Sequence, residues 1–317
     1  MSDYSQFSIN DRWIESLRGS KNLVDKHKPY AWLVEKERTK TARTEDVGII
    51  FLTNKECPYR CLMCDLWKNT ADESVGAGSI PEQVEWALKM MPGVKHVKLY
   101  NNGSFFDEQA IPSSDYEKIA LLLDDLETVI VECHPRLVGE KCVRFSDMLK
   151  PELEVALGLE TVNPDVLKKL NKKMTTEDFS KAVRFLKKNG ISSRTFILLR
   201  PPFLSEAEGV DWAMRSIDFA FGSGAECCTV IPVRGGNGAM ERLQEDGLFS
   251  PPGIRSLEAV LEYGIKLKSG RVFADVWDLA KFSECPDCLD RRRERLIFMN
   301  LNQEIPLPVE CGCTHTT

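Results

Sequence analysis

The stretch VGIIFLTNKECPYRCLMCDLWKN, residues 47–69, joins a short apolar run to three closely spaced cysteines. The run at 47–52 is rich in aliphatic and β-branched residues, which predicts a buried strand. Cys57, Cys61 and Cys64 follow in one loop with the spacing C-x3-C-x2-C. Thiolates bind soft metals, and such short spacings let one loop fold around a single centre. The stretch therefore predicts a metal-binding loop at the end of a strand.

Five further apolar runs follow along the chain, and several lack the alternation of a half-exposed strand. Such runs are typical of strands buried on both faces of a parallel sheet. Helix signals separate them, for example Pro81 in a first turn and the capping pairs Thr175 with Asp178 and Ser205 with Glu208. Six such units predict an α/β fold, a partial (β/α)6 barrel of the TIM type. The six predicted strands are 47–52, 96–101, 128–133, 153–160, 194–200 and 227–233.

The remaining sequence predicts an appendage on each side of the barrel. Residues 8–44 are charged and are interpreted as helical, so residues 1–44 form a predicted N-terminal helical segment. The barrel is predicted over residues 45–270. Residues 271–317 break the strand–helix pattern and form a predicted Cys-rich C-terminal extension.

Composition limits the class of protein. Of 317 residues, 43% are hydrophobic and 28% charged, as in a soluble globular protein. The net charge of −6 argues against a strongly basic nucleic-acid surface but leaves a local basic patch open. No apolar run approaches the roughly 18 residues needed to cross a bilayer, and the first residues lack a signal pattern. We therefore predict a cytoplasmic protein without a membrane partner, whose eleven cysteines serve more as metal ligands than as disulfides.

Three thiolates leave one position open on a four-iron centre. Four cysteines would close a [4Fe–4S] cluster, whereas three leave one iron for an exogenous ligand. The amino and carboxylate groups of S-adenosylmethionine (SAM) fit such a position. The C-x3-C-x2-C motif after the first strand resembles the radical SAM superfamily. That resemblance implies a [4Fe–4S] cluster on Cys57, Cys61 and Cys64, cleavage of SAM to a 5′-deoxyadenosyl radical, and a reductant such as flavodoxin or ferredoxin. Met63 stands where the superfamily usually has an aromatic residue near the adenine.

Other strand ends carry the remaining predicted SAM contacts, because chemistry in parallel barrels lies at these ends. Asn102, Gly103 and Ser104 follow the second strand, where the superfamily has a Gly-rich segment near the SAM amino group; a plain turn is the alternative. Glu160 ends the fourth strand and is predicted to bind the ribose or the amino group. Arg200 ends the fifth strand, where it either meets the SAM carboxylate or forms a rim salt bridge.

Several segments together resemble one branch of the superfamily, the archaeosine-synthase-type group, which belongs with the elongator-subunit, methylthiotransferase and nitrogenase-cofactor-type domains. They include YNNGSFFDEQAIP, VECHPR, GLETVNPDVLKKLNK, RPPFLSEAE and ECPDC. The resemblance implies a lyase or a related step of tRNA modification, in which radical C–N cleavage of a lysine adduct completes an amidine on a 7-deazaguanine base. The alternative within the superfamily is an enzyme that acts on a small molecule or peptide.

The C-terminal cysteines form two pairs, Cys285 with Cys288 and Cys311 with Cys313. Two pairs at this separation predict a second metal site, either a structural zinc or an auxiliary iron–sulfur cluster. The run RRRER at 291–295 between them suits RNA phosphates or a solvated helix face. If both cysteine groups bound structural zinc, the chain would be a non-catalytic zinc-binding module.

Overall fold

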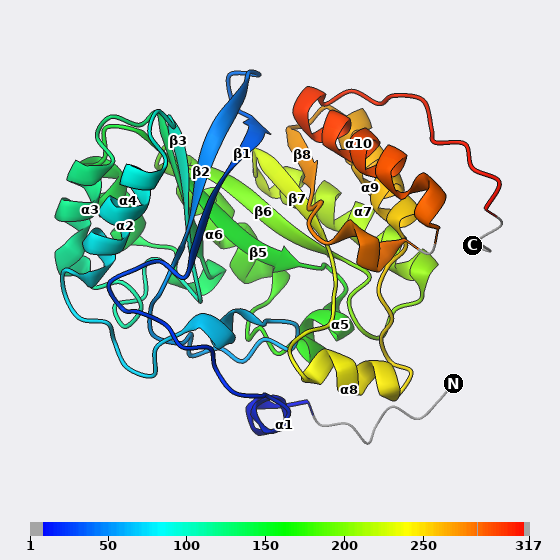
Figure 1. Cartoon of the computed structure of the whole chain (residues 1–317), viewed down its shortest axis with the longest axis horizontal. Helices are drawn as coiled ribbons and strands as arrows, with labels where there is room; N and C mark the ends of the chain where they lie inside the picture. The colour runs from blue at the N-terminus through cyan, green and yellow to red at the C-terminus, as the bar shows by residue number, and fades with distance from the viewer. Residues whose placement is uncertain (1–8, 284, 314–317) are drawn as a thin grey trace.

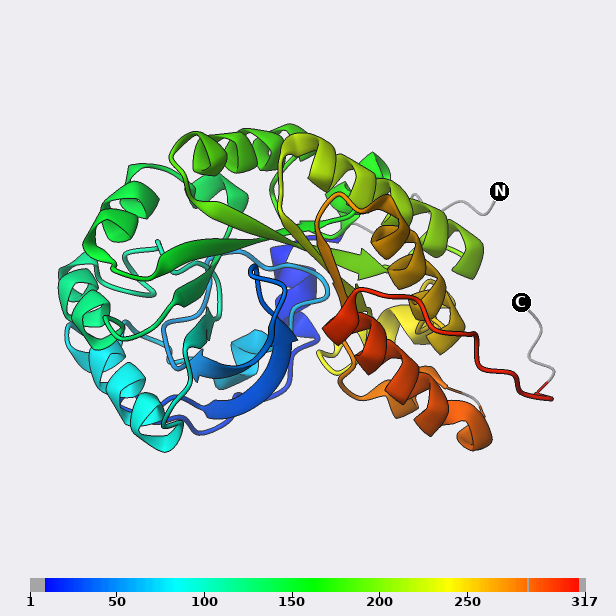
Figure 2. The same ribbon diagram turned by 90° about the horizontal axis from the view of Figure 1, so that it is seen from above.

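The computed structural model describes residues 9–283 and 285–313, and its centre is one curved sheet (Figure 1). Within these residues the sheet has eight strands in the order β1-β2-β3-β4-β5-β6-β7-β8. β1 pairs antiparallel with β2, and all later pairs are parallel. The sheet curls into a half-barrel that stays open between β1 and β8 (Figure 2). The predicted α/β partial barrel is confirmed.

The six strands predicted from the sequence are all present, and their ends differ from the prediction by at most three residues. Two further strands complete the sheet. The strands are β1 (Ala31–Arg38), β2 (Thr44–Leu52), β3 (His96–Asn101), β4 (Thr128–Cys133), β5 (Glu152–Glu160), β6 (Ser192–Leu199), β7 (Cys227–Pro232) and β8 (Arg271–Ala274).

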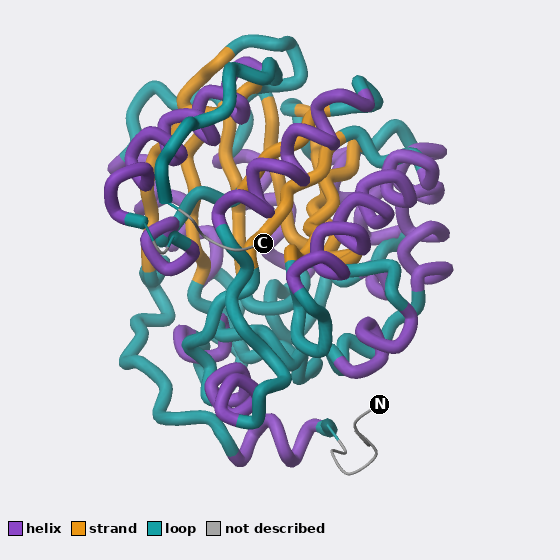
Figure 3. Tube along the Cα trace, turned by 90° about the vertical axis from the view of Figure 1, so that its right-hand side faces the viewer, coloured by secondary structure: helices purple, strands orange, loops and turns teal. Residues whose placement is uncertain are grey.

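Helices cover the convex face of the sheet, and loops gather at the carboxyl ends of the parallel strands (Figures 1 and 3). Both predicted capping boxes, at Thr175 and Ser205, are formed. In the described ranges, no helix combines the length and apolarity needed to traverse a bilayer. The α-helices are α1 (Asp11–Ser16), α2 (Ser79–Met90), α3 (Tyr116–Leu122), α4 (Glu140–Met148), α5 (Pro164–Lys169), α6 (Thr176–Lys188), α7 (Glu206–Ser223), α8 (Ala239–Glu245), α9 (Ile254–Leu267) and α10 (Pro286–Asn302). The 3-10 helices are η2 (Leu66–Asn69), η3 (Ser113–Asp115), η4 (Pro135–Leu137) and η5 (Leu279–Phe282).

The N-terminal region differs from the helix predicted over residues 8–44. Only Asp11–Ser16 is helical, and Ala31–Arg38 forms strand β1. The charges of this strand resemble a solvated helix face in the sequence, but Glu35 and Glu37 lie two residues apart and point to the same side of the strand. Both carboxylates pair with Lys98 inside the sheet.

The C-terminal region also contributes to the sheet. β8 extends it beyond residue 270, and the side chain of Asn300 in α10 bonds the backbone N–H and carbonyl of Ala274 at 2.9 and 2.8 Å. Gln303 bonds Val272 in the same way at 2.8 and 2.7 Å. These amides satisfy the free edge of β8, where a further strand would otherwise pair. The sheet thus runs across both predicted boundaries, at residues 45 and 270, and the division into three domains stays a prediction.

A buried charge cluster closes the half-barrel at the amino ends of the strands. Arg194, 2% exposed, bonds Glu37 through both Nη atoms at 3.0 and 2.6 Å and Glu154 through Nε at 2.7 Å. Lys98 lies 2.5 Å from Glu37, and Arg271 lies 2.7 Å from Glu154. Because these charges are paired, their burial at this end of the half-barrel costs much less than the burial of isolated ions.

Candidate active site

A cavity of about 940 Å³ occupies the concave side of the sheet and reaches the carboxyl ends of the strands. It is large enough for a drug-sized or nucleotide-sized ligand. Seven of the predicted site residues line it, from three different parts of the chain. They are Cys57, Cys61, Met63, Cys64, Asn102, Gly103 and Glu160.

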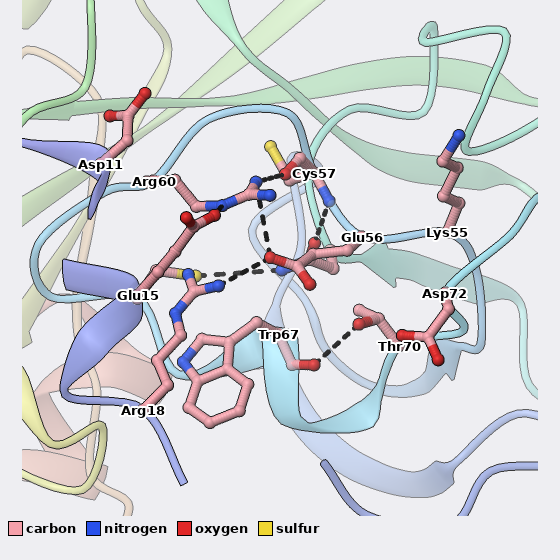
Figure 4. A network of polar contacts seen from close by, with 12 residues as sticks. Asp11, Glu15, Arg18, Lys55, Glu56, Cys57, Arg60, Trp67, Thr70 and Asp72 are labelled. Atoms are coloured by element: carbon pink, nitrogen blue, oxygen red, sulfur yellow. Dashed lines mark hydrogen bonds and ion pairs between the residues drawn. The ribbon is translucent and has the colours of Figure 1, made fainter. Parts of the chain in front are cut away.

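Ionic contacts with the N-terminal helix brace the cysteine loop (Figure 4). Arg60 donates to the carbonyl of Cys57 and lies 2.5 Å from Glu15 of α1. Glu56 pairs with Arg18 at 2.7 Å, and the Arg18 guanidinium lies 4.8 Å from the centre of the Trp67 ring. Glu56 precedes the first cysteine and Trp67 follows the last one, so these contacts fix the loop at its start and at its end.

Amides from distant loops hold the backbone between the cysteines. Asn171 Nδ2 donates to the carbonyl of Arg60 at 2.7 Å. Asn237, 4% exposed, donates to the carbonyls of Leu62 and Cys64 at 2.7 and 3.2 Å. Two loops far from the cysteines in sequence thereby hold the backbone that carries the thiols along the cavity wall.

The loop after β3 approaches the cysteine loop closely. The backbone N–H of Cys57 donates to Asn102 Oδ1 at 2.5 Å. Gly103 has a φ of +99°, and a Cβ added there would lie 3.0 Å from the Cβ of Cys57 and 3.1 Å from its Sγ. Only glycine combines this backbone conformation with so little space. The contact explains why a small residue follows Asn102.

A buried ion pair lies beside the thiols, and its lysine was missed in the sequence. Lys172, 8% exposed, forms a short contact with Glu160 Oε1, and both residues line the cavity. A Cβ on Gly158 would lie 2.2 Å from both charged atoms, so only glycine leaves room for the pair. Glu160 itself has a φ of +66°, an uncommon conformation for a side-chain-bearing residue. The glycine two residues before Glu160 was the signal that a sequence reading could have used.

His134, with its imidazole in the neutral form, joins the cysteine loop to the segment that carries Lys172. Its ring stacks on Tyr59 with centroids 4.1 Å apart, and its Nδ1 accepts from the backbone N–H of Arg136 at 3.3 Å. Nε2 therefore carries the proton and donates to the carbonyl of Lys172 at 3.0 Å. Burial, aided by the nearby charge of Lys172, lowers the pKa of His134 to about 4. The imidazole links the cysteine loop to the ion pair.

Aromatic side chains form the other part of the cavity wall. Phe51 contacts Tyr30, Tyr100 and Trp277, with ring centroids 5.6, 6.1 and 5.9 Å apart respectively. Tyr100 in turn contacts Phe196 at 6.2 Å. All five rings line the cavity. A flat, apolar ligand surface would gain both burial and stacking there.

The comparisons with known proteins agree with this geometry. The sequence profile described as the radical SAM superfamily matches residues 52–208. The archaeosine synthase subunit beta of Thermococcus kodakarensis is 30% identical over 226 residues, which cover 68% of this chain and 69% of that protein. The chain belongs to the radical SAM superfamily, in the archaeosine-synthase-type group.

Two further comparisons cover more of the chain or show its fold. An uncharacterized protein of Methanocaldococcus jannaschii is 25% identical over 336 aligned positions, covering 96% of this chain and 92% of that protein. The archaeal Methanocaldococcus infernus Elp3 with an N-terminus deletion has a solved structure that matches with a TM-score of 0.51 and 15% identity. The match covers 69% of this chain and 59% of that one, and it shows a common fold.

The cysteine loop fits the [4Fe–4S] cluster that the radical SAM family implies. Burial raises the pKa of Cys57, Cys61 and Cys64 to about 12 each, so these thiols need a bound metal to lose their protons near neutral pH. Within residues 9–283, their three Sγ atoms do not form a set that lies entirely within 4.8 Å. That wider spacing suits thiolates that cap different irons of a cluster and suits a single ion poorly.

Two predicted radical SAM contacts lie off the cavity wall. Ser104 is 2% exposed and bonds the Sγ of Cys133 at 3.3 Å. Arg200 bonds Glu206 at 2.6 Å and the carbonyl of Pro251 at 2.8 Å, which is the rim salt bridge that the sequence left as an alternative. A contact of Arg200 with SAM stays a prediction and would require these bonds to break.

Glu132, another cavity residue, is expected to make stability depend on pH. Burial raises its pKa from 4.5 to about 8. The folded state therefore binds a proton that the unfolded state has already lost, and stability falls as pH rises from about 5 to about 8. Because glutamine cannot ionise, Glu132→Gln should remove part of this fall, on the order of a few kcal/mol.

Urea unfolding of both proteins at about pH 6 and about pH 8.5 checks this expectation. The wild type should lose more stability between the two pH values than the variant. Equal losses would show that Glu132 is ionised in the folded protein at neutral pH.

Proposed function

We propose that this radical SAM enzyme reductively cleaves SAM at a [4Fe–4S] cluster and acts on a modified base of tRNA. The observation that carries the first part is the loop of Cys57, Cys61 and Cys64, which amides from two distant loops brace beside a large cavity. When bound, the cluster supplies the electron that converts SAM to a 5′-deoxyadenosyl radical, and a donor such as flavodoxin or ferredoxin supplies that electron to the cluster.

The chain's own residues divide the cavity into two parts. The three thiolates hold the cluster, and Met63, Asn102 and Gly103 surround the adjoining space where SAM binds. The aromatic wall lies along the remainder of the cavity and receives the substrate. The half-barrel excludes water from the space between, so that a radical formed there meets the substrate first.

We assign Glu160 and Lys172 to the charged groups of SAM. The methionine part of SAM carries an ammonium and a carboxylate, and the buried pair offers one partner for each. Glu160→Gln and Lys172→Met are each expected to weaken SAM binding by about tenfold, which corresponds to about 1.4 kcal/mol. The double variant should lose less than the sum, because either single change already breaks the pair.

Anaerobic calorimetric titration of the reconstituted proteins with SAM measures these affinities. Lys181→Met is the matched control, since Lys181 pairs with Glu177 on the exposed face of α6. Its affinity should equal that of the wild type. Unchanged affinity in both cavity variants would remove Glu160 and Lys172 from the SAM site.

The tRNA part of the proposal rests on the relatives and on the aromatic wall. Two curated relatives, from Thermococcus kodakarensis and Methanosarcina acetivorans, are named archaeosine synthase subunit beta. Rings such as Phe51 and Trp277 suit stacking on a nucleobase. We therefore propose a lyase-type step, a radical C–N cleavage on a 7-deazaguanine base. The net charge of −6 favours the second candidate, a small-molecule or peptide substrate.

The test is tRNA-dependent formation of 5′-deoxyadenosine by the reconstituted enzyme with SAM and dithionite. Total archaeal tRNA from a strain that accumulates the lysine-bearing 7-deazaguanine should raise the yield several-fold, and an unmodified transcript should not. Equal yields with and without tRNA, from a protein that cleaves SAM, would exclude the tRNA substrate. They would leave SAM cleavage itself standing.

A further inference from the structure

The four C-terminal cysteines converge on one point outside the cavity. The Sγ atoms of Cys285, Cys288, Cys311 and Cys313 all lie within 4.8 Å of one another, and those of Cys285 and Cys311 are 3.8 Å apart. Four thiolates around one zinc ion at ~2.3 Å form a tetrahedron whose edges are ~3.8 Å. Thiolates on a four-iron cluster each cap a different iron and stand farther apart. We propose that these four cysteines bind a single zinc ion.

The elements around the site are arranged like those of a closed structural site. Cys285 caps the amino end of α10, and Cys288 lies in the first turn of that helix. Cys311 and Cys313 come from the extended segment that follows α10 and returns along it (Figure 1). All four ligand positions of a tetrahedral ion are thus supplied by the protein, which distinguishes a structural zinc site from a catalytic one.

Two arginines donate hydrogen bonds to the sulfurs, which is a separate sign of thiolates. Arg292 Nε lies 3.3 Å from the Sγ of Cys288, and Arg255 Nη2 lies 3.2 Å from the Sγ of Cys313. Four thiolates and one divalent ion carry a net charge of −2, so cationic donors stabilise the site. Two arginines of the run RRRER, Arg292 and Arg295, are only 5% and 6% exposed. Their side chains are therefore not available to bind RNA phosphates.

The same arginines tie the returning segment to the helices. Arg292 forms a short contact with Glu258 of α9 and bonds the carbonyl of Val309 at 3.3 Å. Arg295 bonds the carbonyl of Leu307 at 2.9 Å. The zinc ion completes this attachment at the far end, because it joins the start of α10 to the end of the segment.

The site acts on the cavity through α10. Ile297, Asn300 and Leu301 of this helix line the cavity, and Asn300 also caps the edge of β8. Since the open side of the half-barrel lies between β1 and β8, α10 forms the wall there (Figure 2). The zinc ion therefore fixes one wall of the substrate cavity at a distance, without touching SAM or the substrate.

Metal analysis of three variants tests the proposal. The Cys57→Ala/Cys61→Ala/Cys64→Ala variant cannot hold the catalytic cluster, and it should still contain about one zinc per chain and almost no iron. Adding Cys288→Ser to it should remove most of the zinc. The control is Cys142→Ser in the same background, which should leave the zinc in place because Cys142 is a buried cysteine of α4. Iron and sulfide in the triple variant, or zinc unaffected by Cys288→Ser, would overturn the proposal.

Cobalt substitution and hydrogen exchange make the test independent of how the serine variant folds. The triple variant loaded with Co²⁺ should show the visible bands of a tetrahedral tetrathiolate ion. Chelation of the zinc should speed amide exchange at least tenfold in α10 and residues 303–313 but not in α6. Octahedral cobalt spectra would contradict the site, and unchanged exchange would contradict its role in fixing α10. Neither outcome depends on SAM cleavage, so failure here is distinct from failure of the proposed function.

Discussion

Replacement of Cys61 by alanine is expected to abolish reductive SAM cleavage, with 5′-deoxyadenosine falling at least ~100-fold. Cys61 is one of only three thiols in the loop, and the fold supplies two carbonyl-anchoring amides, Asn171 and Asn237, to place them. With only two thiolates left, two of the four irons lack a protein ligand, and the cluster is lost or misplaced. The measurement is 5′-deoxyadenosine by chromatography after anaerobic reconstitution with iron and sulfide.

Cys142→Ala is the control for this prediction. Cys142 is fully buried in α4 and does not line the cavity, so the variant should cleave SAM at nearly the wild-type rate. If both variants lost 5′-deoxyadenosine formation, the loss would reflect general damage to the fold. Full activity in Cys61→Ala would show that SAM cleavage does not use this loop.

Arg194→Met is expected to destabilise the fold by about 3–5 kcal/mol. The substitution keeps much of the side-chain volume but removes one of the two cations that hold each of the buried carboxylates of Glu37 and Glu154. Both carboxylates have pKa values below the usual range despite their burial, with Arg194 the largest of the cations that lower them. With one cation fewer, the two buried carboxylates recover less of the cost of their desolvation.

Urea unfolding gives this free energy, and Arg215→Met is the matched control. Arg215 pairs with Asp211 on the exposed surface of α7, where both side chains are more than half exposed. Such pairs contribute about 0.5 kcal/mol or less. A loss for Arg194→Met as small as that of the control would mean that water or a rearranged Lys98 replaces the arginine.

Patterns confined to one segment were predicted well from the sequence. The run TVIVEC, for example, predicts β4, and the spacing of the three cysteines predicts the metal-binding loop. Both depend on residues that are neighbours in the chain. The capping boxes of α6 and α7 were likewise readable, because each involves residues only three positions apart.

Features that depend on distant partners were not predicted. β1 carries a charged sequence whose burial becomes understandable only in the fold, where Glu37 meets Arg194, 157 positions away. Lys172 has no local mark of function, and its contact with Glu160, on the other side of α5 in the sequence, becomes visible only in the fold. The zinc proposal depends on the distances between the sulfurs of the two cysteine pairs, which only the structure gives. The spacing of these cysteines in the sequence is compatible with either zinc or an iron–sulfur cluster.

The most direct test of the central claim is electron paramagnetic resonance of the reduced, reconstituted protein with and without SAM. We expect the spectrum of a [4Fe–4S]⁺ cluster whose line shape changes when SAM is added, because SAM occupies the iron that the three thiolates leave free. A cluster spectrum that SAM leaves unchanged would contradict the account, and so would zinc in place of iron at Cys57, Cys61 and Cys64.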